Sequence, residues 1–236
     1  RTELLLRGAE TLAARGEYAA ARACVECIGG TSGPERGRAL AVLARTGDSA
    51  ALSNLAVDYP AVLEAHPQLP PLSMVTSSFS APQWRRHAAA WLAAGNPHRA
   101  LVAARRAGKP AALEAARASL RLRRAGDAIQ WAGQSGERAA PRFLVEAEAN
   151  RQLAWGAAEA GRRNYFAAAV RAAETALRLA REESDRGAAH LFAAEGLSES
   201  GRFVEAAVHL LPWGGAAGRD GPRGRAARRG VRRRLL

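Results

Sequence analysis

Alanine- and leucine-rich runs recur along the chain, and several are interrupted by a glycine that is followed by a polar residue. Three such segments are AARGEYAAARACVECI (13–28), WLAAGNPHRALVAARRAG (91–108) and ESGRFVEAAVHLL (199–211). In each, an alanine follows the glycine five positions later. We interpret each segment as two helices joined by a turn, because glycine readily adopts the positive φ that ends a helix.

The pattern predicts six such helical hairpins. The predicted turn glycines are Gly16, Gly47, Gly95, Gly126, Gly161 and Gly201. Their separations of 31, 48, 31, 35 and 40 residues scatter around a 34-residue helix–turn–helix period. The longest separation contains segment 60–82, which holds five of the eleven prolines. We expect this segment to be an inserted loop with at most one short helix, because proline ends helices.

The hairpins resemble tetratricopeptide repeats (TPRs) over about residues 2–213. The matching residues are Trp84, Gly95 and Ala100 in the middle, Leu12, Gly16, Tyr18 and Ala21 near the start, and Gly201, Phe203 and Ala206 near the end. The Leu-Gly pair of the family is intact in none of them, and its closing proline is mostly missing. The resemblance implies an all-α fold, a right-handed α-α superhelix (TPR-like solenoid) of about six helical hairpins. The alternative is an unrelated alanine-rich helical array.

Composition agrees with an all-α protein. The chain is 48% hydrophobic, mostly through Ala and Leu, and only 6% aromatic. Ala and Leu favour helices, whereas strands favour β-branched and aromatic residues. Small alanines also let helices approach closely, so we expect Ala21, Ala100 and Ala206 to be buried where two helices cross. No apolar run reaches the roughly 20 residues of a membrane helix, and we expect a cytoplasmic location with no membrane partner.

The charge is concentrated at one end. The net charge of the whole chain is +13, and residues 214–236 alone carry eight Arg and one Asp. We expect this segment to be a disordered basic tail, because it has few large apolar residues. It is either a solvated tail or an arm that binds nucleic acid through residues 219–236. Arg supplies 34 of the 35 basic residues, which is typical of a GC-rich genome and weakens the nucleic-acid interpretation.

Motifs that suggest chemistry are weak in this chain. Cys24 and Cys27 form a CxxC, but a zinc site needs further ligands at suitable spacing, and the pair lies within a predicted helix. The segment GLSES (196–200) lacks the final glycine and the preceding strand of a nucleophile elbow. The five histidines are scattered in the sequence. We therefore expect no catalytic residues, no bound metal and no cofactor, and the protein is not expected to be an enzyme.

A partner-binding groove follows from the TPR resemblance, which implies that the first helix of each repeat lines a concave surface. The residues at the corresponding positions in the middle repeats are Arg85, Leu92, Leu120, Arg123, Arg124, Arg151, Trp155 and Glu159. The end repeats place Glu3, Glu10, Glu195 and Glu199 there. The groove is thus expected to be basic in the middle and to capture an acidic, partly apolar segment of a partner protein. The alternative is that these arginines pair with neighbouring glutamates.

Three functions remain open from the sequence. The first is a protein–protein interaction module of a bacterial regulatory or signalling protein, because segment 172–203 resembles the helical repeats of large bacterial regulators. The second is a nucleic-acid-binding regulator that uses the arginine-rich tail and groove. The third is the helical scaffold of a larger enzyme whose catalytic domain lies outside this chain.

Overall fold

The computed structural model describes residues 1–28 and 33–211, and this part of the chain is built from helices. Helices account for 81% of it, and it contains no strand. The prediction of an all-α protein is therefore confirmed. None of the described helices combines the length and the apolar character needed to cross a bilayer. The arginine-rich segment 214–236 lies outside the described residues.

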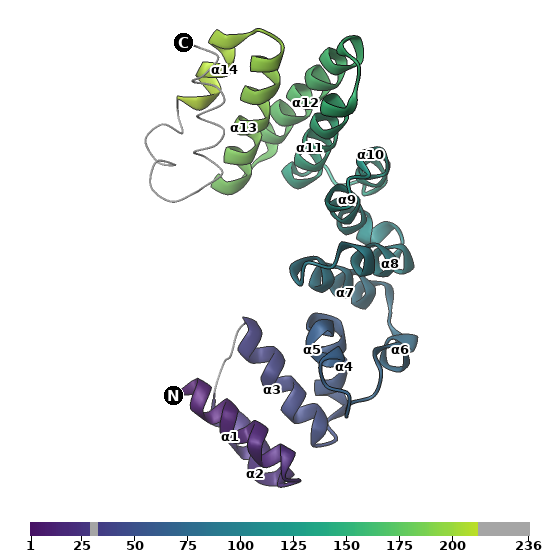
Figure 1. Cartoon of the computed structure of the whole chain (residues 1–236), viewed down its shortest axis with the longest axis vertical. Helices are drawn as coiled ribbons and strands as arrows, with labels where there is room; N and C mark the ends of the chain where they lie inside the picture. The colour runs from purple at the N-terminus through teal and green to yellow at the C-terminus, as the bar shows by residue number, and fades with distance from the viewer. Residues whose placement is uncertain (29–32, 212–236) are drawn as a thin grey trace. The chain divides into compact units, whose positions relative to one another are not determined.

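The chain divides into two compact units, unit 1 (Arg1–Glu114) and unit 2 (Ala115–Leu236), where the sequence predicts a single helical domain over 1–213 (Figure 1). The elements of unit 1 are α1 (Thr2–Ala14), α2 (Tyr18–Glu26), α3 (Gly33–Arg45), α4 (Ser49–Asp58), α5 (Pro60–Glu64), α6 (Leu72–Val75), the 3-10 turn η1 (Thr76–Ser78), α7 (Ala81–Ala93), α8 (Pro97–Ala107) and the 3-10 turn η2 (Lys109–Ala111). The division falls within α9 (Ala112–Arg121). Unit 2 continues with α10 (Ala125–Gln134), α11 (Ala140–Gly156), α12 (Glu159–Leu179), α13 (Glu183–Glu199) and α14 (Phe203–Leu210).

Four hairpins turn at a glycine that the sequence identifies. The φ angles of Gly16, Gly47, Gly95 and Gly201 are 80°, 89°, 77° and 78°. At the α7–α8 turn, the amide of Gly95 donates to the carbonyl of Leu92 (3.1 Å) and the next amide donates to the carbonyl of Trp91 (2.9 Å). This pair of bonds is a Schellman motif, which satisfies the last carbonyls of the first helix. The same pair closes the other three turns.

The α9–α10 turn uses an arginine instead of the predicted glycine. Gly126 lies inside α10, whereas Arg123, three residues earlier, has a φ of 60°. Its amide donates to the carbonyl of Leu120 (3.0 Å), and the amide of Arg124 donates to that of Ser119 (2.9 Å). The Schellman geometry is thus retained, and the predicted position of this turn is three residues too late.

The α11–α12 turn has a different geometry, and Gly161 does not form it. Gly161 lies inside α12. The two helices are joined by Ala157 and Ala158, whose ψ angles of 155° and 160° are those of extended backbone. Alanine adopts such a conformation without strain, so this connection leaves no glycine signal in the sequence.

Successive hairpins pack in a repeated way within each unit. In unit 1, α3 packs against both α1 and α2, and α7 packs against α4. In unit 2, α11 packs against α10, and α13 packs against both α11 and α12. The alanines expected at the crossings, Ala21, Ala100 and Ala206, are completely buried. The small side chains therefore allow the close helix approach that the sequence predicts.

The proline-rich segment 60–82 is more helical than expected. It contains α5, α6 and η1, and Pro60 is the first residue of α5, a position where its missing amide hydrogen is not needed. α5 packs against α3, α4 and α7, and α6 packs against α4 and α5. Leu63 and Leu69 are buried in a core cluster with Leu55 of α4. The segment is thus an integral part of unit 1, and the division of the chain falls elsewhere.

Candidate functional site

In unit 1, the predicted groove residues are engaged within the fold. Leu92 is only 7% exposed, so its side chain packs inside unit 1 and offers little surface to a partner. The Nε atom of Arg85 donates a hydrogen bond of 3.1 Å to Oε1 of Glu114, whose carboxylate is buried. Of the two α7 residues that the TPR alignment selects, Leu92 is thus buried, whereas the side chain of Arg85 is 44% exposed.

In unit 2, Arg151 is held by two glutamates. Its guanidinium donates to both carboxylate oxygens of Glu148 (2.7 and 2.9 Å) and to Oε1 of Glu195 on α13 (3.3 Å). Burial acts to raise the pKa of Glu148, but hydrogen bonds from Arg151 and Gln152 outweigh it and lower that pKa. The hydrogen bonds that Arg151 donates to Glu148 in turn raise the pKa of Arg151. Arg151 thus joins α11 to α13, as in the alternative interpretation of the groove.

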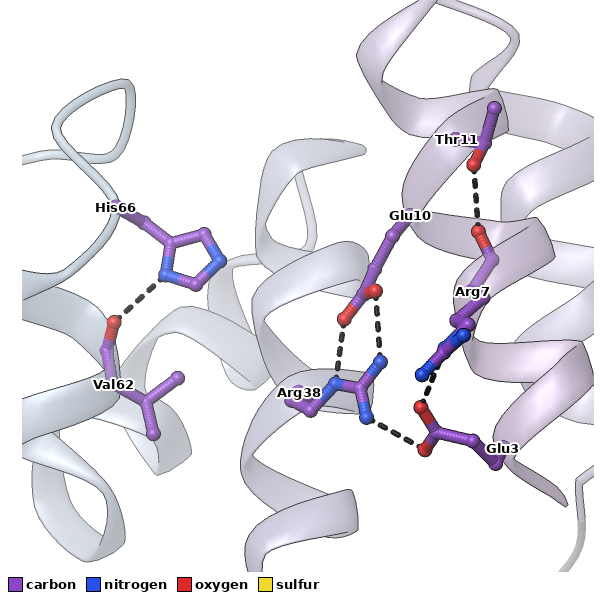
Figure 2. Close-up of polar contacts among 7 residues, drawn as sticks. All are labelled: Glu3, Arg7, Glu10, Thr11, Arg38, Val62 and His66. Atoms are coloured by element: carbon purple, nitrogen blue, oxygen red, sulfur yellow. Dashed lines mark hydrogen bonds and ion pairs between the residues drawn. The ribbon is translucent and has the colours of Figure 1, made fainter.

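The glutamates expected at the start of the groove are engaged as well. Figure 2 shows Arg38 of α3 between Glu3 and Glu10 of α1. Arg38 donates two hydrogen bonds to Glu10 (2.7 and 2.8 Å) and one to Glu3 (2.7 Å). The hydrogen bond from Arg38 is the main reason that the pKa of Glu3 is lowered. These carboxylates join α1 to α3, so their charge is compensated within unit 1.

The other predicted groove residues differ in exposure. Leu120 is half-buried, whereas Arg123 and Arg124 are exposed in the α9–α10 turn. Trp155 is 46% exposed, with its ring 5.5 Å from that of Phe166 in an edge-to-face arrangement. Of the predicted groove residues in unit 2, Arg123, Arg124, Trp155 and Glu159 are therefore the ones exposed at its surface.

A cleft that the sequence does not predict lies in unit 1, between the proline-rich segment and the α7–α8 hairpin. Its volume is about 820 Å³, within the range of ligand-binding pockets. Its lining residues combine apolar, aromatic and basic groups, and they include Leu63, Leu69, Leu72, Trp84, His87, Trp91, Val102, Arg99 and Arg106. His66 also lines it, with Nδ1 2.8 Å from the carbonyl oxygen of Val62 (Figure 2).

One wall of the cleft is a column of edge-to-face rings. Trp84, His87 and Trp91 lie at i, i+3 and i+7 of α7, a spacing that places them on one helix face. Centroid distances are 5.4 Å between Trp84 and His87 and 6.0 Å between His87 and Trp91. Phe79 extends the column at 5.3 Å from Trp84. His87 is buried, and burial lowers its pKa.

Two arginines of α8 lie over this column. The guanidinium carbon of Arg99 is 4.6 Å from the ring centroid of Trp91, and that of Arg106 is 4.8 Å from that of Trp84. Arg99 also forms an ion pair with Glu64 of α5. In the part of the chain that the structure describes, no carboxylate pairs with Arg106. The cleft thus has an aromatic wall with two ordered cations, one of them uncompensated.

The sequence contains a signal for this cleft. The i, i+3, i+7 spacing of Trp84, His87 and Trp91 indicates an aromatic helix face, and Arg99 and Arg106 share a face of the next helix. The TPR register points instead to Arg85 and Leu92 on α7. The segment 60–82 covers this aromatic face. Its position depends on contacts that no local pattern in the sequence encodes.

Two histidines that are distant in sequence also meet. The Nδ1 atoms of His190 on α13 and His209 on α14 lie 3.1 Å apart. Burial and the nearby charge of His209 lower the pKa of His190. Within residues 1–28 and 33–211, no group of three or more His, Cys, Asp or Glu residues is arranged to hold a metal ion. Cys24 and Cys27 are both free thiols.

Comparison with known proteins adds no relative. No protein-family model matches the chain, and no curated protein matches it in sequence.

Proposed function

We propose that the chain is a protein–protein interaction module, a TPR-like right-handed solenoid that belongs to a bacterial regulatory or signalling protein. The observation that carries the proposal is the repeated packing within each unit. The first helix of a hairpin packs against both helices of the preceding hairpin, as α3 does on α1 and α2, and as α13 does on α11 and α12. Such stacking builds extended surfaces for binding other proteins.

The ion pairs between neighbouring first helices support the same proposal. Arg38 joins α3 to α1, and Arg151 joins α11 to α13. Both pairs connect hairpins that are adjacent in the chain, which is the nearest-neighbour organisation of a repeat protein. Their role is to hold the array together, so partner recognition is assigned to other side chains.

The rival function is nucleic-acid binding through segment 214–236. The observation in its favour is the charge of that segment, eight Arg against one Asp. Binding of this kind depends on the release of counterions, so it weakens steeply as salt increases. Retention of a protein partner by helical surfaces does not require the segment.

Affinity purification from extract of the source cells, with and without nuclease treatment, distinguishes the two functions. The full chain and a chain that ends at residue 211 are immobilised side by side, and the retained proteins are quantified by mass spectrometry. We expect both chains to retain the same proteins at about 0.15 M salt. Loss of all retained proteins on nuclease treatment, or on removal of residues 212–236, contradicts the interaction module and supports the nucleic-acid function.

A further inference from the structure

We infer that the cleft between segment 60–82 and the α7–α8 hairpin binds an acidic peptide segment that carries a bulky apolar side chain. The inference rests on the proposed function and deepens it, because it assigns partner recognition to a site outside the predicted groove. The features that carry it are the uncompensated charge of Arg106 and the apolar and aromatic lining of the cleft.

Charge is the first argument. Arg106 is exposed, stacks over Trp84 and has no carboxylate partner among the described residues. Arg99 stacks over Trp91 and forms an ion pair with one carboxylate, that of Glu64. Stacking on a ring leaves the N–H edge of a guanidinium available to a carboxylate. The cleft therefore offers an anion-binding group whose orientation is already set.

Spacing is the second argument. Arg99 and Arg106 are seven residues apart on α8, so their positions are separated by roughly 10 Å along the helix axis. An extended peptide covers that distance in about three residues. A ligand that contacts both arginines with acidic side chains can thus place an intervening apolar side chain against the half-buried Trp84 and the exposed Val102 of the lining.

The apolar surface of the cleft is the third argument. Trp84 is half-buried, and Val102 of α8 is 56% exposed although it lies between the two arginines on the lining. Leu63, Leu69 and Leu72 line the opposite side from the proline-rich segment. Covering an exposed valine beside a tryptophan with an apolar side chain of the ligand favours binding, because apolar surface is removed from water. This accounts for the bulky apolar residue in the ligand.

A nucleic acid fits the cleft less well than a peptide. Glu64 lies on the lining and repels each phosphate of a backbone that carries one charge per nucleotide, whereas a peptide can place an apolar residue beside it. The chain's own segment 214–236 is also disfavoured, because its eight arginines would face Arg99 and Arg106. An acidic peptide of a partner is the occupant that matches both the charge and the apolar lining.

The test uses the full chain and a fluorescein-labelled synthetic peptide, Leu-Asp-Phe-Leu-Asp-Leu, with blocked ends, in which the two Asp residues are three positions apart. Binding is measured by fluorescence anisotropy for the wild type, for Arg106→Gln and for the matched control Arg105→Gln. Arg105 is the exposed neighbour of Arg106 and is not part of the cleft lining. We expect Arg106→Gln to weaken binding by about tenfold, since a charge-assisted hydrogen bond is lost, and Arg105→Gln to bind within twofold of the wild type.

Two competitors complete the design: the same peptide with Asn in place of Asp, and a single-stranded oligonucleotide. The Asn peptide is expected to compete at least tenfold more weakly than the Asp peptide. The inference is overturned if the wild type does not bind the Asp peptide, if Arg105→Gln weakens binding as much as Arg106→Gln, or if the oligonucleotide displaces the peptide at lower concentration than the unlabelled Asp peptide. If the Arg106→Gln chain retains the full set of proteins in the affinity purification described under the proposed function, the proposal of an interaction module is supported and only the assignment of this cleft as the binding site is contradicted.

Discussion

The indole Nε1 of Trp91 donates a hydrogen bond of 3.0 Å to Nε2 of His87. Nε2 is therefore the acceptor in a neutral ring, and the proton is on Nδ1, which lies 2.7 Å from the carbonyl oxygen of Ala56. Both nitrogens of this buried histidine are satisfied in one tautomer. If the ring bound a second proton, at Nε2, that N–H would face the indole N–H of Trp91. The contact therefore favours the neutral ring.

This contact predicts that stability falls in mild acid. Burial lowers the pKa of His87 below its ordinary value of 6.5; the hydrogen bond to Ala56 and the nearby Glu64 oppose this shift, and Arg106 adds to it. The unfolded chain therefore binds a proton at higher pH than the folded chain does. The free energy of unfolding should be level above about pH 6.5 and should fall as pH decreases below it.

The measurement is urea denaturation at about pH 7.5 and pH 5.5 for the wild type, His87→Gln and the control His98→Gln. His98 lies on the same cleft but is exposed. We expect His98→Gln to keep the acid-induced loss and His87→Gln to lose part of it; His190, whose pKa burial also lowers, contributes to the remainder. An unchanged pH dependence in His87→Gln contradicts the assignment.

The α9–α10 turn predicts a stabilising substitution. Arg123 has a φ of 60°, a conformation that costs a residue with a Cβ atom about 1 kcal/mol and costs glycine almost nothing. Arg123→Gly should therefore raise the free energy of unfolding by about 0.5–1 kcal/mol. Circular dichroism during chemical denaturation measures this change.

Gly126→Ala is the matched comparison for this turn. If Gly126 formed the turn, as the sequence predicts, alanine would destabilise the protein. Because Gly126 lies inside α10 and an added Cβ atom would meet no atom within 4 Å, alanine should leave stability unchanged or increase it. Gly95→Ala, at a φ of 77°, should decrease it.

These turns illustrate how far the sequence predicts the fold. Glycine marks a turn only where a positive φ is needed, so Gly16, Gly47, Gly95 and Gly201 are informative. Gly126 and Gly161 lie within helices, so treating them as turn residues misaligns their repeats. The turns beside them are formed by Arg123 and by the pair Ala157 and Ala158. The sequence thus predicts the number of hairpins and their approximate positions but not every boundary.

The site is less predictable than the fold, for a physical reason. The ion pair of Arg38 with Glu10 and that of Arg151 with Glu195 join residues 28 and 44 positions apart, and no helical spacing identifies such partners. The same holds for the cleft, where segment 60–82 covers the aromatic face of α7. Helix faces can be read from local spacing, whereas the groups that compensate or cover them are known only from the packing.

Gly196 predicts a destabilising substitution on α13. A Cβ atom added there would lie 2.6 Å from Cγ2 of Val170 and 3.2 Å from the carbonyl oxygen of Phe166, both on α12. Helix α12 must move for alanine to fit, so Gly196→Ala should cost about 1–3 kcal/mol of unfolding free energy. The control is Gly133→Ala on α10, where no atom lies within 4 Å; equal stability of the two variants contradicts the close packing of α12 and α13.

The Arg151 network predicts a change in both stability and acid sensitivity. Arg151→Met keeps much of the side-chain volume but removes the hydrogen bonds to Glu148 and Glu195. The partly buried carboxylate of Glu148 then has only Gln152 as a donor. We expect a loss of about 1–3 kcal/mol, measured by urea denaturation at neutral pH. Arg163→Met is the control, because its pair with Glu159 is exposed and should contribute little.

The pH dependence of the same variant tests the cause of the loss. In the wild type the pKa of Glu148 lies below its ordinary value of 4.5, so the stability it contributes is present above about pH 4.5 and is lost as pH falls further. In Arg151→Met, burial is no longer outweighed by the arginine, and protonation of Glu148 relieves a buried charge. The difference in unfolding free energy between wild type and variant should therefore shrink as pH decreases through 4.5. A difference that stays constant with pH would show that Arg151 stabilises unit 2 through its packing and not through its charge.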